Sequence, residues 1–280
     1  MRVLVTGHSG FTGRYIIDAL NAAGHEALPF NADVTDWPDV EAAVAEGKPD
    51  AAIHLAANAF VQSSDVTGFY LVNQIGTFHL LEAIVRHSPG IPVLVASSAN
   101  VYGDSSQGLL SEDAICAPVN HYGASKLAME IGAKLWANRL KLVIARPFNY
   151  TGEGQDERYL IAKIVAHFRR RDPAIELGNI GVAREFGDVR SVTQAYVELL
   201  ERGCEGTFNI CTGQVHSVAD VIQICEQISG HSIAVQVNPA FVRHADPQSL
   251  GGDPSRIRSA LPNWRPHDLR ETLEWMMSSK

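Results

Sequence analysis

Residues 2–13 read RVLVTGHSGFTG: a short apolar strand runs straight into a turn with glycines at positions 7, 10 and 13, and a helical pattern follows. A strand, a glycine-rich turn and a helix in this order form the context in which proteins hold a dinucleotide. Glycines permit the tight turn and let the backbone approach the pyrophosphate, which sits on free N–H groups of the helix. The spacing is Gly-x-x-Gly-x-x-Gly rather than the general Gly-x-Gly-x-x-Gly. The expected cofactor contacts in this turn are Gly7, Gly10, Phe11, Thr12 and Gly13.

Beyond this turn, buried strands alternate with helical patterns along the first half of the chain. Such alternation predicts an α/β fold, a doubly wound parallel Rossmann sheet with helices on both faces. We expect residues 1–147 and 187–214 to form a dinucleotide-binding domain. Residues 148–186 and 215–280 are expected to form a smaller C-terminal substrate-binding lobe over the strand ends.

Nucleotide choice is usually set at the end of the second strand, where an acid binds the ribose 2′-hydroxyl or an arginine binds a 2′-phosphate. Asn31 and Ala32 occupy that position here, so the choice between NAD and NADP is left open. Asp33, followed by Val34, either binds the adenine amine or forms a turn. We expect both residues to line the cofactor site.

The third expected strand, 51–57, ends in small residues. Ala56 and Ala57 would let the dinucleotide pass close to the backbone, and Leu55, Ala56 and Ala57 are expected cofactor contacts. We interpret His54, inside this strand, as a core histidine rather than a catalytic one.

Tyr122 and Lys126 stand four residues apart in a helical pattern, so both side chains can reach one site. A nearby ammonium favours the phenolate, and we expect it to lower the pKa of Tyr122 from the usual value of about 10. Such a tyrosine can act as a general acid or base. The pair alone is common on solvated helix faces. Because Ser98 adds a hydroxyl at the end of the preceding strand, 93–96, we expect Ser98, Tyr122 and Lys126 to form a catalytic set.

The 280-residue chain carries a formal net charge of −8 and is 46% hydrophobic. Nucleic-acid binders are usually basic, so we expect no nucleic-acid partner. No apolar run approaches the roughly 20 residues of a membrane span, and the N-terminal apolar run is too short for a signal peptide. We therefore expect a cytoplasmic protein without membrane contact. The four cysteines form no Cys-x-x-Cys pair, and we expect no metal site.

The order of these parts resembles the extended short-chain dehydrogenase/reductase family. The similar stretches are residues 6–13, 54–57, 97–103, 122–126 and 146–149. Further stretches at 146–155, 175–180 and 184–189 resemble the GDP-mannose 4,6-dehydratases and the GDP-4-keto-6-deoxy-mannose reductases. The resemblance therefore covers nearly the whole chain.

This resemblance implies an NAD(P)-dependent enzyme for nucleotide-linked sugars. The dehydratases carry an acid shortly after the strand-end hydroxyl, and it helps to remove water from the sugar. This chain has Ala99 and Asn100 there, and neither can shuttle a proton. A Ser-Tyr-Lys set suffices for hydride transfer to a ketone. The expected activity is reduction of the C4 ketone of a 4-keto-6-deoxy sugar by NADPH or NADH, with NADPH slightly preferred. GDP-4-keto-6-deoxy-mannose would give GDP-rhamnose or its C4 epimer.

The resemblance also assigns roles to single residues. Tyr122 would deliver the proton, Ser98 would hold the carbonyl oxygen, and Lys126 would bind the nicotinamide ribose. An arginine fork suits the substrate diphosphate. The expected substrate contacts are Ser98, Asn149, Arg184, Arg243 and Asp246. The histidines without an assigned role are His8, His121 and His244.

A homodimer is also expected. Helices predicted at 69–86 and 122–138 are apolar beyond one stripe, as helices packed on both a sheet and a partner would be. The resembling family pairs these two helices with those of a second subunit in a four-helix bundle.

Three alternatives stay open. A nucleotide-sugar 4-epimerase uses the same Ser-Tyr-Lys set but keeps tightly bound NAD. A reductase of another nucleotide keto sugar would share every motif. A dinucleotide sensor without enzymatic activity would keep the glycines and could dispense with Tyr122 and Lys126, so the presence of that pair disfavours it.

Overall fold

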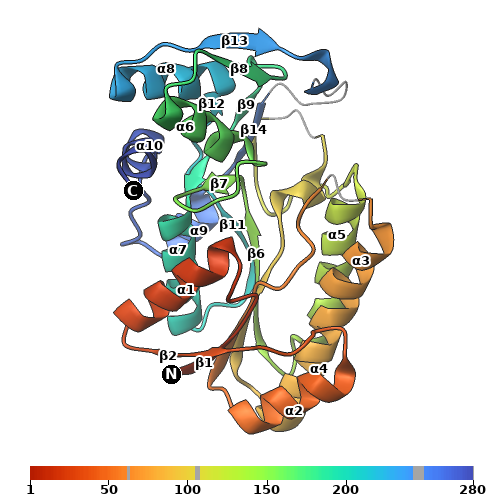
Figure 1. The fold of residues 1–280 in the computed structure, drawn as a ribbon. Coiled ribbons are helices and arrows are strands. Elements are labelled where there is room, and N and C mark those ends of the chain that lie inside the picture. The colour runs from red at the N-terminus through yellow and green to blue at the C-terminus, as the bar shows by residue number, and fades with distance from the viewer. Residues whose placement is uncertain (62–63, 105–107, 242–248, 280) are drawn as a thin grey trace.

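The computed structural model describes residues 1–61, 64–104, 108–241 and 249–279. Its centre is a parallel sheet of six strands in the order β11-β6-β4-β3-β1-β2 (Figure 1). Winding reverses between the neighbours β1 and β3, so the predicted doubly wound parallel sheet is confirmed. The strands of this sheet are β1 (Arg2–Thr6), β2 (Glu26–Pro29), β3 (Ala51–His54), β4 (Pro92–Ala96), β6 (Lys141–Pro147) and β11 (Gly206–Ile210).

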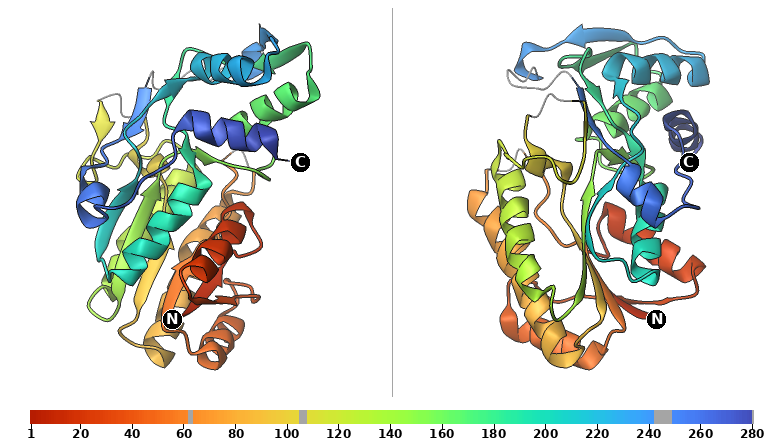
Figure 2. Two further views of the ribbon diagram at one scale, coloured as in Figure 1. Left: turned by 90° about the vertical axis from the view of Figure 1, so that its left-hand side faces the viewer. Right: turned by 180° about the vertical axis from the view of Figure 1, so that it is seen from behind.

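Alternate residues of the central strands face opposite layers of helices. Val3 and Val5 of β1 pack with α1, α7 and α9, whereas Leu4 packs with α2, α4 and α5. The two layers are visible on either side of the sheet in Figure 2. The helices of these layers are α1 (Phe11–Ala22), α7 (Val189–Glu201) and α9 (Ser255–Ala260) on one face, and α2 (Trp37–Gly47), α4 (Thr77–His87) and α5 (His121–Ala133) on the other.

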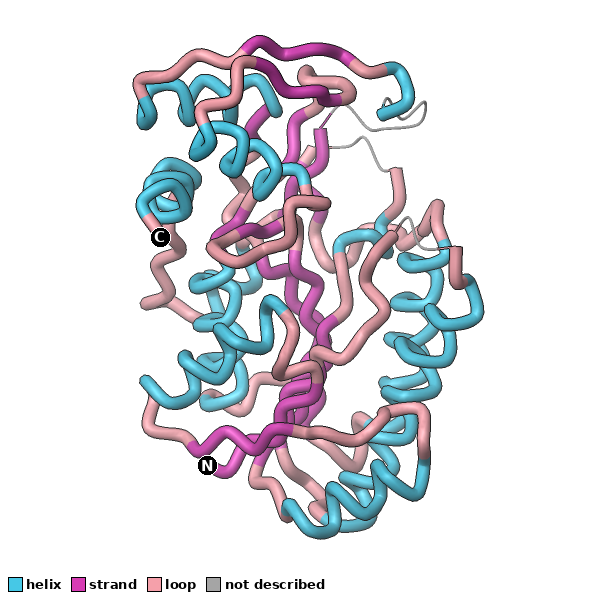
Figure 3. The backbone as a smooth tube through the Cα atoms, in the orientation of Figure 1, coloured by secondary structure: helices cyan, strands magenta, loops and turns pink. Residues whose placement is uncertain are grey.

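A second hydrophobic core lies in the C-terminal half of the chain. Helices α6 (Leu160–Arg170), α8 (Val218–Ser229) and α10 (Leu269–Ser278) enclose it with the parallel pair β8 (Ala174–Leu177) and β13 (Ala234–Val237). Figure 3 shows these elements gathered beyond one end of the central sheet. The division into two domains at the residues given above stays a prediction. Ile257 of α9, assigned to the lobe, packs on the central sheet instead.

Short strands connect the two halves. A four-stranded sheet has the order β12-β9-β14-β5, and β10 pairs with β7. The sequence patterns missed most of these strands, because two residues are too few to show a periodicity. Their bounds are β5 (Leu109–Leu110), β7 (Tyr150–Thr151), β9 (Ala183–Arg184), β10 (Gly187–Asp188), β12 (His216–Ser217) and β14 (Ser249–Gly252); a 3₁₀ turn, η4, covers Pro239–Phe241.

The helix predicted at 69–86 is not one regular α-helix. It comprises α3 (Val66–Tyr70), a π-helical segment η1 (Leu71–Gly76) and then α4. Asn73 lies inside the π-segment, where its side chain accepts from the Asn58 N–H at 2.8 Å and donates to the Ser125 hydroxyl at 3.0 Å. π-Segments within helices often occur at functional sites. The helix predicted at 122–138 is also shorter: α5 ends at Ala133, and a 3₁₀ turn, η3 (Lys134–Trp136), follows.

His54 is a buried histidine with every polar atom satisfied, as expected. The Thr6 hydroxyl accepts the N–H groups of Leu55 and Ala56, both at 3.1 Å, so its proton is left for His54 Nδ1 at 2.6 Å. His54 Nε2–H then donates to Thr77 Oγ1 at 2.9 Å, because that hydroxyl donates to the Asn73 carbonyl. The chain of hydrogen bonds fits only a neutral imidazole. Burial, helped by the charge of Lys126, lowers the pKa of His54 to about 3.

No helix in the described stretches has the length and apolarity that crossing a membrane would require.

We predict that neutral His54 makes folding pH-dependent. An unfolded histidine takes up a proton near its ordinary pKa of 6.5, whereas the buried one takes it up only near 3. This contribution to stability is therefore complete above pH 6.5 and declines as the pH falls below it. Between pH 7.5 and 5, urea titrations should show wild type losing about 2 kcal/mol more unfolding free energy than His54→Gln, whose side chain stays neutral. Parallel pH curves for the two proteins would contradict the assignment.

Candidate active site

The glycine turn has the geometry of a dinucleotide cradle. Gly7 has φ of +67°, and a Cβ there would lie 2.8 Å from the Ala56 nitrogen. At Gly13 a Cβ would collide with the Gly7 carbonyl oxygen. Gly10 is the N-cap of α1, and neither a capping side chain nor an acid occupies the first turn. The N–H groups at Phe11, Thr12 and Gly13 therefore begin a helix whose first turn carries no anionic group, which fits a bound pyrophosphate.

The other residues predicted to bind the cofactor border the same strand ends. Leu55, Ala56 and Ala57 follow β3, and the first two are tied to β1 by the Thr6 hydroxyl. Asp33 is exposed and accepts hydrogen bonds from the Thr35 N–H and hydroxyl, both at 2.8 Å. It therefore forms a turn, which was one of the two roles considered for it. Contact of Asp33 with adenine stays a prediction. Val34 is buried against Gly76.

The Ser98 hydroxyl accepts two hydrogen bonds from one neighbouring residue. Ser98 follows β4 and caps a 3₁₀ turn, η2 (Ala99–Tyr102). Its oxygen accepts from the Asn100 backbone N–H and from Asn100 Nδ2, both at 3.1 Å. A hydroxyl has two acceptor sites and one donor, so Ser98 is left to donate. Asn100, which stands where dehydratases carry their acid, thus has a positioning contact that the sequence did not suggest.

Tyr122 lies in the first turn of α5, where the Asn120 side chain caps the helix by accepting the Gly123 N–H at 2.8 Å. It is 9% exposed. Burial raises the pKa of Tyr122 above its ordinary value; the hydrogen bond with Ser98 lowers it in part, and the phenols of Tyr150 and Tyr159 add to the rise. The expected lowering by Lys126 is therefore wrong for this structure, because loss of hydration has the largest effect on the pKa of this phenol and raises it. A raised pKa keeps the phenol protonated, which is the state of a proton donor.

Lys126 lies one turn further along α5 and is 2% exposed. Its Nζ donates to the carbonyl of Ala96, the last residue of β4, at 2.8 Å. Burial lowers the pKa of Lys126 to about 8, against the opposing effect of Glu130. The structure thus brings Lys126, Tyr122 and Ser98 together at the end of β4. Their catalytic roles stay predictions.

Two tyrosines near Tyr122 were not foreseen. Tyr150 hydrogen-bonds through its hydroxyl with Thr12 of α1 at 2.7 Å, and its ring stacks with Phe11 at 6.3 Å between centroids. Tyr159 occupies the N-cap position of α6, where its side chain makes no capping hydrogen bond, and is 38% exposed. Both act on the pKa of Tyr122. Tyr150 lies in a two-residue strand and Tyr159 directly before α6, so neither has a periodic pattern around it that the sequence could show.

The predicted substrate residues are only partly placed. Asn149 is exposed, and its carbonyl accepts the Gly187 N–H at 2.8 Å. Arg184 lies in β9, whose neighbour β14 pairs with β5 from the segment between Ser98 and Tyr122. Its Nη1 donates to the Ala183 carbonyl at 2.7 Å. Arg243 and Asp246 lie outside the described residues, as does His244.

The two other unassigned histidines have different surroundings. His121 is exposed at the start of α5, and its ring hydrogen-bonds with the Tyr70 hydroxyl at 3.1 Å. His8 lies in the glycine turn, and its Nδ1 is buried with no partner in the described part of the protein. Neither geometry gives the histidine a catalytic contact.

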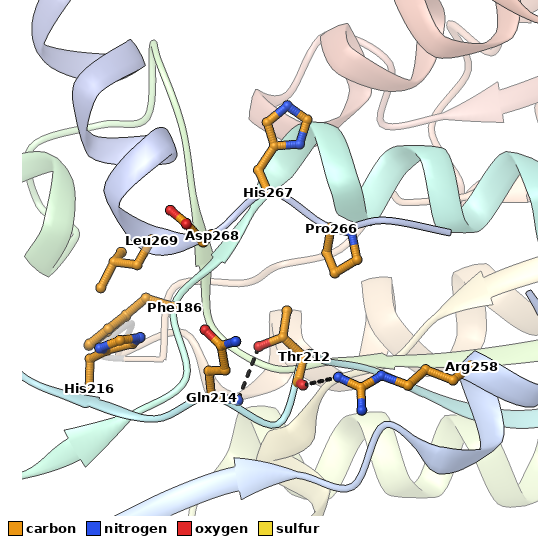
Figure 4. A pocket seen from close by; sticks show the side chains of 9 residues that line it. All are labelled: Phe186, Thr212, Gln214, His216, Arg258, Pro266, His267, Asp268 and Leu269. Atoms are coloured by element: carbon orange, nitrogen blue, oxygen red, sulfur yellow. Dashed lines mark hydrogen bonds between the residues drawn. The ribbon is translucent and has the colours of Figure 1, made fainter. Parts of the chain in front are cut away.

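A cavity of about 60 Å³ lies away from these residues, between the segment after β11 and the start of α10. Figure 4 shows Arg258 and Gln214 beside Thr212, with His267 turned outward. None of the predicted site residues lines it, so it is not the substrate site considered below. Its lining residues are Phe186, Thr212, Gln214, His216, Arg258, Pro266, His267, Asp268 and Leu269. A smaller cavity of about 10 Å³ shares Thr212 and Pro266 with it and reaches Asn149.

Comparison with characterised proteins gives consistent matches along the whole chain. GDP-6-deoxy-D-talose 4-dehydrogenase of Aggregatibacter actinomycetemcomitans is 37% identical over 100% of this chain and 98% of its own length. GDP-6-deoxy-D-mannose reductase of Pseudomonas aeruginosa is 31% identical over 99% of this chain and 96% of its own.

The chain is also similar over nearly its whole length to solved structures. A Burkholderia cenocepacia protein named as a candidate epimerase superposes with a TM-score of 0.93 and 43% identity, covering 99% of this chain and 96% of its own. RMD from Pseudomonas aeruginosa, in complex with NADPH, gives a TM-score of 0.91 and 29% identity, covering 99% and 97%.

A sequence profile of the family described as GDP-mannose 4,6 dehydratase matches residues 29–276. This match covers most of the chain and includes Ser98, Tyr122 and Lys126, the three residues that meet at the end of β4. The chain therefore belongs to the GDP-mannose 4,6-dehydratase family of extended short-chain dehydrogenases/reductases.

Proposed function

We propose that this protein is an NAD(P)H-dependent reductase of the C4 ketone of a nucleotide-linked 4-keto-6-deoxy sugar, with GDP-4-keto-6-deoxy-mannose as substrate. The observation that carries the proposal is the arrangement of proton donors at the end of β4. Tyr122 is buried and protonated, and Ser98 has its acceptor sites filled by Asn100. Both hydroxyls can therefore donate to one carbonyl oxygen. Relatives that act on GDP-6-deoxy sugars support the choice of substrate.

Donors already aimed at the ketone oxygen stabilise the negative charge that grows on it. When bound, the dinucleotide supplies the hydride. Tyr122 gives its proton to the oxygen, and Ser98 holds that oxygen by its remaining donor. Lys126, fixed by the Ala96 carbonyl, holds the nicotinamide ribose. The product is the C4 alcohol, GDP-rhamnose or its C4 epimer.

The substrate diphosphate is assigned to Arg184 and Arg243, with Asn149 and Asp246 on the rest of the nucleotide sugar. The cofactor assigned to the glycine turn is NADP or NAD. The solved RMD structure holds NADPH. Asn31, two residues beyond the end of β2, is exposed and is neither acidic nor basic, so the chain does not reject either form by charge at this point.

A 4-epimerase with retained NAD is the second candidate, favoured by the candidate epimerase from Burkholderia cenocepacia that matches nearly the whole chain. An epimerase removes and returns hydride at one carbon, so it keeps its cofactor through the cycle. Purified protein should settle the choice: a reductase exchanges its dinucleotide within each turnover, whereas an epimerase carries about one tightly held NAD per subunit.

We propose a homodimer built on α3, η1 and α5. Large apolar side chains stand exposed on these elements: Leu71 is 47%, Ile131 63% and Leu135, in η3, 77% exposed. A second subunit would bury them in a four-helix bundle.

We also propose that the protein works in the cytoplasm, where its four cysteines, all free in the structure, would stay reduced.

We predict that Tyr122→Phe abolishes reduction of GDP-4-keto-6-deoxy-mannose and leaves dinucleotide affinity nearly unchanged. The change removes the proton donor and little volume, and general acid catalysis is worth about 10²–10⁴-fold. Steady-state kinetics and fluorescence titration with NADPH measure the two effects. Lys126→Ala should weaken both. A loss below about tenfold in Tyr122→Phe would mean that another group supplies the proton.

The missing dehydratase acid leads to a second prediction. GDP-mannose should bind without being converted and should inhibit keto-sugar reduction competitively. Arg243→Ala should raise the KM of the keto sugar and the inhibition constant of GDP-mannose together, with kcat largely kept, because diphosphate contacts persist in the transition state. Formation of a 4-keto sugar from GDP-mannose, or an unchanged KM in Arg243→Ala, would overturn this assignment.

For the dimer, we predict that Ile131→Glu with Leu135→Glu yields a monomer by light scattering at micromolar concentration, since charges on the apolar face cannot be buried in a partner. The matched control is Val237→Glu. This residue is 58% exposed on β13 of the lobe and should leave the dimer intact. A monomeric wild-type protein would contradict the proposal.

A further inference from the structure

Three consecutive residues at the end of β4 are tied to one face of α5. The Ala96 carbonyl accepts the Lys126 ammonium at 2.8 Å, the Ser97 hydroxyl donates to Glu130 Oε1, and Ser98 hydrogen-bonds with Tyr122. Tyr122, Lys126 and Glu130 are spaced four residues apart, so successive turns present them on the same side of the helix. Glu130 therefore continues the row of side chains that forms the catalytic set.

Glu130 is fully buried and doubly paired. Arg146 of β6 donates from Nε to Oε1 at 2.9 Å and from Nη2 to Oε2 at 2.6 Å. Oε1 also accepts the Ser97 hydroxyl. Bidentate pairs of this kind are strong and fix the geometry of both partners. Glu130 thus connects β4, α5 and β6 at the level of the catalytic residues.

Arg146 is itself held on its far side. Its Nη1 donates to the Tyr102 hydroxyl at 2.9 Å and to the Glu112 carbonyl at 3.2 Å. Tyr102 in turn donates to Asn209 Oδ1 at 2.7 Å. A buried ion pair adds little net stability compared with apolar side chains of the same volume. Folding alone therefore gives no strong reason for an ion pair at this position.

The charge of Lys126 gives such a reason. Lys126 is 2% exposed, and burial disfavours its ammonium. Two titratable groups act with the Lys126 ammonium electrostatically: Glu130 on the same helix, and His54 on β3, which stays neutral. Arg146 on β6 is paired with Glu130. Glu130 is the group that favours the ammonium. Without its carboxylate, burial and an unpaired Arg146 would both act against the charge on Lys126.

We propose that Ser97, Glu130 and Arg146 form a positioning clamp, which fixes the end of β4 against α5 and keeps Lys126 in its charged form. The three residues act through Ser98, Tyr122 and Lys126, and the catalytic part of this inference rests on the function proposed above. The effect of the clamp on the charge of Lys126 can be measured without substrate.

The direct test is a pH titration of Lys126 in the full-length protein, monitored by NMR of ¹³C-labelled lysine. Loss of its signal in Lys126→Ala identifies it. Wild type should titrate near pH 8, in line with the lowered pKa. In Glu130→Gln the midpoint should fall by about one pH unit or more, because a neighbouring carboxylate shifts a lysine by about that much.

Glu130→Gln leaves Arg146 unpaired and can fail to fold, so a second variant keeps the test decisive. The double change Glu130→Leu with Arg146→Met removes both charges and replaces them with apolar volume, which buried sites tolerate. Its Lys126 midpoint should also fall. Ser191→Ala is the matched control: Ser191 is a buried serine on α7 that accepts the His267 N–H at 2.9 Å. Its Lys126 midpoint should equal that of wild type.

Ser97→Ala separates geometry from charge, because it keeps the Glu130–Arg146 pair. We expect its kcat to fall about tenfold through misplacement of Ser98, with the Lys126 midpoint and NADPH affinity near wild type. An unchanged Lys126 midpoint in the folded charge variants would overturn the clamp, as would an unchanged kcat in Ser97→Ala. A wild-type protein inactive on the keto sugar would overturn the proposed function alone, since the NMR titration would still report on the clamp.

Discussion

The ammonium of Lys126, buried at the junction of β4 and α5, is the constraint around which the site is built. A buried charge must be hydrogen-bonded and balanced, or it is lost. The Ala96 carbonyl supplies the hydrogen bond, and the carboxylate of Glu130 supplies the balance. Burial and the charge of Lys126 keep His54 on β3 neutral, and its hydrogen bonds, which run from Thr6 to Asn73, fit the neutral ring. The neighbouring polar networks therefore leave the Lys126 ammonium with a carboxylate nearby and a neutral imidazole in place of a second charge.

The parallel sheet explains why these groups meet. In a doubly wound sheet the carboxyl ends of all strands lie along one edge, and ligands bind where the winding reverses. That edge holds the glycine turn after β1, the Leu55–Ala57 segment after β3 and Ser98 after β4. The fold itself does not choose the reaction. In the function proposed above, reduction is favoured over loss of water because Asn100 stands where the dehydratases carry an acid; in this structure it donates to Ser98.

Much of this arrangement could be predicted from the sequence, because the continuous apolar run of β1 and the helical patterns of α1 and α5 are clear signals. The π-segment around Asn73 could not, since the contacts that Asn73 makes with Asn58 and Ser125 exist only in the folded chain. The two-residue strands carry no periodicity. The spacing of Tyr122 and Lys126 predicted their proximity correctly, but the direction of the pKa shift depends on burial. The contacts of Glu130 with Arg146 and Ser97 join three elements distant in sequence, and only the folded chain shows them.

The central claim is that hydride leaves the dinucleotide and stays on the sugar. It is tested most directly with NADPH deuterated at the transferable position of the nicotinamide and GDP-4-keto-6-deoxy-mannose as the acceptor. A reductase predicts one deuterium at C4 of the GDP-6-deoxy-hexose product for each NADPH consumed, as read by NMR and mass spectrometry. Interconversion of C4 epimers without consumption of NADPH, or a product free of deuterium at C4, would contradict it.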